Sequence, residues 1–212
     1  MCSIYKIIVL IYIGLEMATY AGNEVGNGGN GVVCKDRVEL LDIYEAKVLR
    51  KIAIDPAIKG TDPFGIAEQR LEILKEVDSK SAQIYLSELK LLKTEISFED
   101  GIKLKPIDDS LHSFEPKEAG CKVSQLAVFR KKRLPGEKQV LIDKNVWERL
   151  NPVNQAGLIL HESIFKHLSD LGEKDSTKAR YLVSFILTEE FSKKNPEIYW
   201  TLIKKMRLTI YR

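Results

Sequence analysis

Apolar residues recur every three or four positions over 41–52 and again over 62–96, which is the spacing of one face of a helix. Asp36 stands where it could cap the first of these helices. The second begins with Asp62 and Pro63, a cap followed by a proline in the first turn. It is either one long helix or a helical hairpin broken near Asp78.

The middle of the chain has the pattern of strands. Residues 96–98 and 102–104 flank Glu99-Asp100-Gly101, which predicts a β-hairpin. Residues 123–129 and 139–143 flank a turn with Pro135-Gly136 and predict a second hairpin.

Three further helices are predicted at the end of the chain. Asn151 caps a helix of about 20 residues that Pro152 begins. Asp175 or Ser176 caps the next, and Pro196 begins the last. The order of these elements predicts an α+β fold with a helical N-terminal part, a small antiparallel sheet of two hairpins, and a C-terminal three-helix cluster.

The composition is that of a globular protein, because 44% of the 212 residues are hydrophobic and 30% are charged. We expect one domain over 34–212. A formal net charge of +3 is too small to argue for nucleic acid, so no nucleic-acid partner is expected.

Residues 1–21 have the layout of a secretory signal peptide, with Lys6 before an apolar run and small residues after it. Thr19 and Ala21 suit the positions before a cleavage site, so cleavage after Ala21 is expected. An uncleaved membrane anchor is the alternative, but the apolar run is short for a span of about 20 residues. The sequence therefore predicts an exported protein, periplasmic or secreted.

Export changes the interpretation of the cysteines. Cys2 leaves with the signal peptide, and Cys34 and Cys121 are then predicted to form a disulfide bond in an oxidising compartment. Two buried thiols are the alternative. The segment before Cys34, residues 22–33, is rich in Gly and Asn and predicts a flexible leader. An anion-binding loop of backbone amides is its second interpretation.

Four basic residues stand at the tip of the second predicted hairpin: Arg130, Lys131, Lys132 and Arg133. They could meet an anionic envelope surface or another protein, although such residues are more often a solvated tip that also blunts a sheet edge. The sequence does not name a partner.

The stretch HESIFKH, from His161 to His167, carries the strongest hint of chemistry. A strand, a short linker helix and an apolar helix that ends in His-Glu resemble the core of zincin metallopeptidases. In that family two histidines four residues apart bind zinc, and the intervening glutamate activates water. The resemblance implies that Glu162 is catalytic and that His161 is a zinc ligand.

This chain departs from the zincin pattern at the second ligand. Phe165 occupies the position four residues after His161, and His167 lies about 240° further round the helix. We therefore favour a structural polar cluster of His161, Glu162, Ser176 and Arg180, with an Arg180–Glu162 pair between adjacent helices. The rival is a metal-dependent hydrolase that takes further ligands from elsewhere, such as His112, His167 or Asp175.

Several segments, GNGGNGVVC, ELLDIYEA, QLAV and QAGLILHESIF…DS…AR, also resemble an uncharacterised family of exported Gram-negative bacterial proteins. That resemblance implies the compartment and a single folded unit, but no activity. The preferred hypothesis is an exported binding or structural module without a cofactor, and zinc belongs to the alternative, a zincin-like hydrolase.

Overall fold

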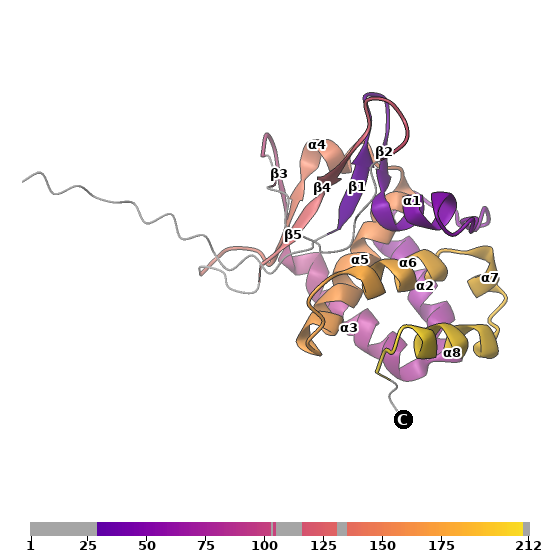
Figure 1. Ribbon diagram of the computed structural model, residues 1–212. Helices are drawn as coiled ribbons and strands as arrows, with labels where there is room; N and C mark the ends of the chain where they lie inside the picture. Colours follow the sequence, from indigo (N-terminus) through magenta and orange to yellow (C-terminus); the bar gives the residue numbers. More distant parts are fainter. Residues whose placement is uncertain (1–28, 103, 105–115, 131–134, 210–212) are drawn as a thin grey trace, which may run out of the picture.

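Six short strands form two small sheets on one side of a helical body (Figure 1). The computed structural model describes residues 29–102, 104, 116–130 and 135–209. The first sheet is antiparallel and has the order β2-β1-β4, from Asn30–Val33 (β1), Val38–Leu40 (β2) and Lys122–Gln125 (β4). The second has the order β3-β6-β5, from Ile96–Glu99 (β3), Ala127–Phe129 (β5) and Val140–Asp143 (β6).

Eight helices occupy the described part of the chain. They are α1 (Leu41–Val48), α2 (Pro63–Val77), α3 (Ser79–Glu95), α4 (Lys144–Trp147), α5 (Pro152–Asp170), α6 (Thr177–Ile186), α7 (Glu189–Ser192) and α8 (Pro196–Lys205). Helix α5 packs against α2, α3 and α6 and is buried on almost every side. An apolar helix of this kind is expected at the centre of a fold. None of the helices described is both long and apolar enough to cross a membrane.

The predicted helix starts are confirmed where a side chain caps them. Asp62 accepts a hydrogen bond from the Phe64 amide before α2, and Asn151 accepts one from Asn154 before α5. The predicted break at Asp78 is also present, and Asp78 caps α3 by accepting from the Ser81 amide. These starts follow from local chemistry, because a cap satisfies amides that the first helical turn leaves open.

The α+β class is confirmed, but four details of the prediction are wrong. Asp36 does not cap the first helix, because Val38–Leu40 form β2 and α1 follows Leu40 without a side-chain cap. Residues 30–33, assigned to the flexible leader, form β1 because β2 and β4 pair with it on both sides. β3 pairs in parallel with β6 rather than forming a hairpin with 102–104. The predicted strand 123–129 divides at Leu126 into β4 and β5, which belong to different sheets. Residues 22–28 of the predicted leader and the predicted signal peptide lie outside the described residues.

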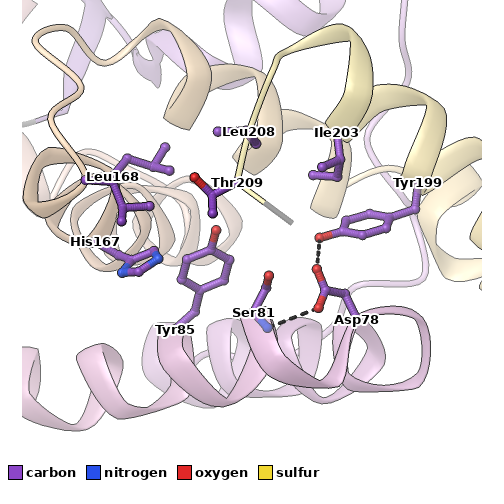
Figure 2. A pocket seen from close by; sticks show the side chains of 10 residues that line it. Asp78, Ser81, Tyr85, His167, Leu168, Tyr199, Ile203, Leu208 and Thr209 are labelled. Atoms are coloured by element: carbon purple, nitrogen blue, oxygen red, sulfur yellow. Dashed lines mark hydrogen bonds between the residues drawn. The ribbon is translucent and has the colours of Figure 1, made fainter. Parts of the chain in front are cut away.

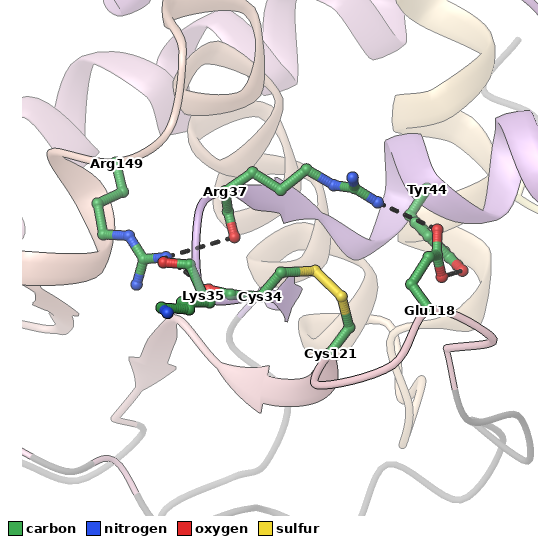
Figure 3. The surroundings of a disulfide bond; sticks show 7 residues. All are labelled: Cys34, Lys35, Arg37, Tyr44, Glu118, Cys121 and Arg149. Carbon is green, nitrogen blue, oxygen red and sulfur yellow. Dashed lines mark hydrogen bonds and ion pairs between the residues drawn. A yellow bond between two sulfur atoms is a disulfide. The ribbon is translucent and has the colours of Figure 1, made fainter.

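Cys34 and Cys121 form the predicted disulfide bond, which joins the end of β1 to the start of β4 (Figure 3). Arg149 fixes the same corner, because its Nη2 donates to the Cys34 carbonyl over 2.6 Å. Beside the bond, Glu118 accepts hydrogen bonds from Arg37 and from the Tyr44 hydroxyl. The disulfide therefore belongs to a corner that polar contacts also hold together.

Candidate functional site

Helix α5 carries the His-Glu pair in the interior of the protein. His161 is 0% exposed and Glu162 is 1% exposed. A buried polar group has to be hydrogen-bonded or paired, since leaving it alone costs several kcal/mol. The partners of the two side chains therefore show what the motif does.

His161 pairs with Asp42 of α1, at 2.8 Å from Nδ1 to Oδ2. Burial alone would lower the pKa of His161, but the charge and hydrogen bond of Asp42, with the charge of Glu162, raise that pKa to about 9. The imidazole is therefore protonated at neutral pH, and a metal ion would have to displace its proton in order to bind.

Glu162 holds the chain just before β1. Its Oε1 accepts from the Gly29 amide at 2.6 Å, while its Oε2 is buried with no hydrogen-bond partner among the described residues. Burial raises the pKa of Glu162 to about 7, against the charge of His161 and the Gly29 amide, which lower it. Space is tight at this position, because a Cβ at position 29 would lie 2.1 Å from a methyl carbon of Leu158, which would have to move.

Arg180 of α6 completes the cluster from the other side. It donates to Glu45 of α1 at 3.3 Å and to Ser176 at 2.7 Å, and its charge lowers the pKa of His161. Burial raises the pKa of Glu45, although the charges of Arg180 and Arg50 act the other way. The four residues of the predicted cluster thus share one region of the interior. Their hydrogen bonds nevertheless run to α1 and Gly29, and no Arg180–Glu162 pair is present among the described contacts.

Asp42 and Glu45 are the members of the site that sequence reasoning missed. Both lie in ELLDIYEA and are buried, at 0% and 6% exposure. The sequence did not signal their burial, because two acids three residues apart share one face of a helix, as the acids of a solvated face do.

His167 faces a different part of the protein. Its ring lies against Tyr85 of α3, with ring centroids 5.8 Å apart, beside a cavity of about 10 Å³ that holds no more than one water molecule (Figure 2). Tyr199 lines the same cavity and donates to Asp78 at 2.8 Å. Burial lowers the pKa of His167, although Glu88 and Asp170 act the other way.

The remaining predicted residues do not add ligands to His161. Asp175 accepts from the Thr177 amide at the start of α6, and His112 lies outside the described residues. Among the residues that the structure describes, no three His, Cys, Asp or Glu side chains are grouped so that they could hold a metal ion. The donors described here therefore do not fit a zincin zinc site.

The basic tip is described only in part. Arg130 lies 3.8 Å from Glu137 across the turn, and 131–134 fall outside the described residues. Its role as a binding surface stays a prediction.

Comparisons with models of protein families, with curated proteins and with solved structures found no match to this chain. The functional argument therefore rests on the cluster itself. Its chemistry is that of a protonated histidine held between carboxylates in the interior, where it joins α1, α5, α6 and the start of β1.

Proposed function

We propose that the protein is an exported binding or structural module in which the His161-Glu162 pair holds the N-terminal segment in place. The observation that carries this proposal is the hydrogen bond from the Gly29 amide to Glu162, buried beside the His161–Asp42 pair. A third contact from the same helix supports it, since Asn154 Oδ1 accepts from the Leu40 amide at 2.7 Å. Three polar side chains of α5 thus bind the segment that contains β1, β2 and α1.

The rival proposal, a zincin-like hydrolase, needs Glu162 to reach a water molecule on a metal held by His161. The burial of both side chains argues against it, and so does the lack, among the described residues, of a group of three His, Cys, Asp or Glu side chains that could hold a metal ion. Catalysis by Glu162 therefore stays the second hypothesis, and the metal content of the purified protein tests it.

Replacing Glu162 distinguishes the two roles. Glu162→Ala leaves the Gly29 amide buried without an acceptor and opens a cavity, so we expect a loss of roughly 2–4 kcal/mol in the free energy of unfolding. Glu162→Gln keeps an acceptor and is expected to lose less. The stability that Glu162→Gln loses relative to wild type should be smaller at pH 8 than at acidic pH. At pH 8 the wild-type carboxylate, with a pKa of about 7, is ionised in an apolar site and itself destabilises the fold.

Glu72→Ala on α2 is the matched control, because Glu72 is 51% exposed and pairs only at the surface with Lys75. Its expected change is under about 0.5 kcal/mol in urea unfolding. The module hypothesis would be rejected in favour of the hydrolase if the purified protein held stoichiometric zinc and His161→Ala lost that zinc while keeping its circular dichroism spectrum.

The disulfide bond supports export, because such bonds persist in oxidising compartments. We propose a periplasmic or secreted protein that starts at Gly22 after cleavage of its signal peptide. Its partner would be an anionic envelope surface or another protein. Intact-mass analysis of the protein from the periplasm or medium should give a mass that begins at Gly22. A mass that includes Met1 would count against the signal peptide.

A further inference from the structure

A cavity of about 340 Å³ lies between the end of α1 and helices α6 and α8, away from the His161-Glu162 pair. Its wall is mainly apolar and is made by four half-buried side chains: Ile52, Tyr181, Phe185 and Leu202. Pockets that bind small molecules start at about 300 Å³ and combine such walls with a few polar groups. The cavity is therefore large enough for a ligand of about ten to fifteen heavy atoms.

Arg50 supplies the first polar group of this cavity. Its side chain is 12% exposed, and its guanidinium carbon lies 4.2 Å from the centre of the Tyr181 ring. Two of its acceptors are uncharged, the Asp42 carbonyl at 3.2 Å and the Ser184 hydroxyl at 2.8 Å. Arginine lines the cavity here in a fixed position, because the ring and both acceptors hold the guanidinium.

The charge of Arg50 is balanced only in part, because the carboxylate of Glu45 that it pairs with also pairs with Arg180. Glu45 is its acidic partner among the described residues, at 3.5 Å, and burial raises the pKa of that carboxyl. The Nε of Arg50 is also buried without an acceptor in the described structure. A fixed guanidinium that shares its single described counter-charge with a second arginine keeps positive charge available for a carboxylate.

Lys205 supplies a second cation. It lies exposed in the last turn of α8, lines the same cavity, and forms no ion pair with any described residue. The helix dipole favours a cation at this position with or without a ligand. Lys204 shares that position but does not line the cavity, so the two lysines separate the effect of the pocket from that of the helix end.

We propose that this cavity binds a small organic monocarboxylate with an aromatic or branched apolar body. The carboxylate would lie between Arg50 and Lys205, and the apolar body against Tyr181, Phe185 and Leu202. A doubly charged phosphate fits less well, because most of the wall is apolar and would desolvate the second charge. The inference rests on the proposed binding role of the protein. Arg50 links the cavity to the buried cluster through Asp42 and Glu45, but neither His161 nor Glu162 lines the cavity.

The test titrates the exported protein with hydrocinnamate and follows backbone amide shifts by nuclear magnetic resonance. We expect saturable binding with a dissociation constant on the order of 1 mM, with the shifts confined to α6, α8 and the residues after α1. The uncharged amide of the same compound should bind about tenfold more weakly.

Three variants locate the site. Lys205→Glu should weaken hydrocinnamate binding about fivefold or more, while Lys204→Glu, with the same change in net charge, should change it less than about twofold. Leu202→Trp should abolish binding by filling the cavity, with the circular dichroism spectrum retained.

Absence of saturable binding, equal affinity for the acid and its amide, or equal effects of the two lysine variants would each overturn the assignment. If any of these is found while Glu162→Ala still destabilises the fold, only the pocket is rejected. The role of the His161-Glu162 pair is then unaffected.

Discussion

Replacing Asp42 with asparagine removes one charge from the buried cluster while keeping the size of the side chain and an acceptor for His161. Asp42 is the main group that raises the pKa of His161 to about 9, with a smaller contribution from the charge of Glu162, since burial and Arg180 both lower it. We therefore expect the pKa of His161 to fall well below 9 in Asp42→Asn. The imidazole should then be neutral in the folded protein at pH 8.

The size of the effect follows from the two pKa values. A folded pKa of about 9 against 6.5 in the unfolded chain corresponds to roughly 3 kcal/mol, at about 1.4 kcal/mol per pKa unit. Because the folded pKa is the higher one, this stabilisation is fully present below pH 6.5 and is lost as the pH rises through about 9. Asp42→Asn should therefore lose about 3 kcal/mol at pH 6 and much less at pH 9.5.

Glu162 adds its own dependence on pH. Its pKa of about 7 lies above the unfolded value of 4.5, so ionisation of Glu162 lowers stability as the pH rises between these values. Both proteins contain Glu162, and the difference between wild type and variant therefore isolates most of the His161 contribution.

The assay is urea unfolding of both proteins at pH 6 and pH 9.5, with the imidazole of His161 titrated by nuclear magnetic resonance. The reasoning fails if the loss is the same at both pH values, or if the wild-type His161 titrates below 6.5.

Two further predictions concern the other fixed points of the fold. Replacing both Cys34 and Cys121 by serine should lower the free energy of unfolding by roughly 4 kcal/mol, because the bond closes a loop across a separation of 87 residues. Thiol titration of the denatured, unreduced wild type should find neither cysteine reactive. Arg70→Met should cost roughly 3–5 kcal/mol, since this buried arginine pairs with Asp55 and donates to the carbonyls of Ile186 and Thr188. Lys75→Met on the same helix is the control, and equal losses in the two variants would contradict this role of Arg70.

The sequence predicted best what depends on neighbours in the chain. Asp62 and Asn151 cap helices through amides two or three residues away, so their roles can be read locally. The disulfide was predictable for a different reason, since the predicted removal of Cys2 with a signal peptide would leave one possible pair. Each of these inferences needs no knowledge of how distant segments meet.

The errors concern contacts between distant segments. Asn30 and Gly31 have low strand propensity, and the structure makes them a strand only by pairing them with Val38–Leu40 and with β4. The partner of His161 could not be found from α5 alone, because Asp42 lies 119 residues away in the chain. Sequence spacing excluded His167 as a second ligand on the same face, but it could not supply Asp42 as the actual partner.

The two best-supported features of the protein act on the same strand. β1 is fixed at its start by the Gly29–Glu162 hydrogen bond and at its end by the Cys34–Cys121 bond. Burying Asp42, His161, Glu162 and Arg180 is costly in itself, and an apolar cluster of similar volume could be as stable. What the charged cluster adds is specificity for one conformation. Only a fold that brings Asp42 to His161 and the Gly29 amide to Glu162 gives these buried groups their hydrogen-bond partners. A Gly- and Asn-rich segment has few apolar side chains to determine its position, and the cluster provides that determination through backbone and charge instead.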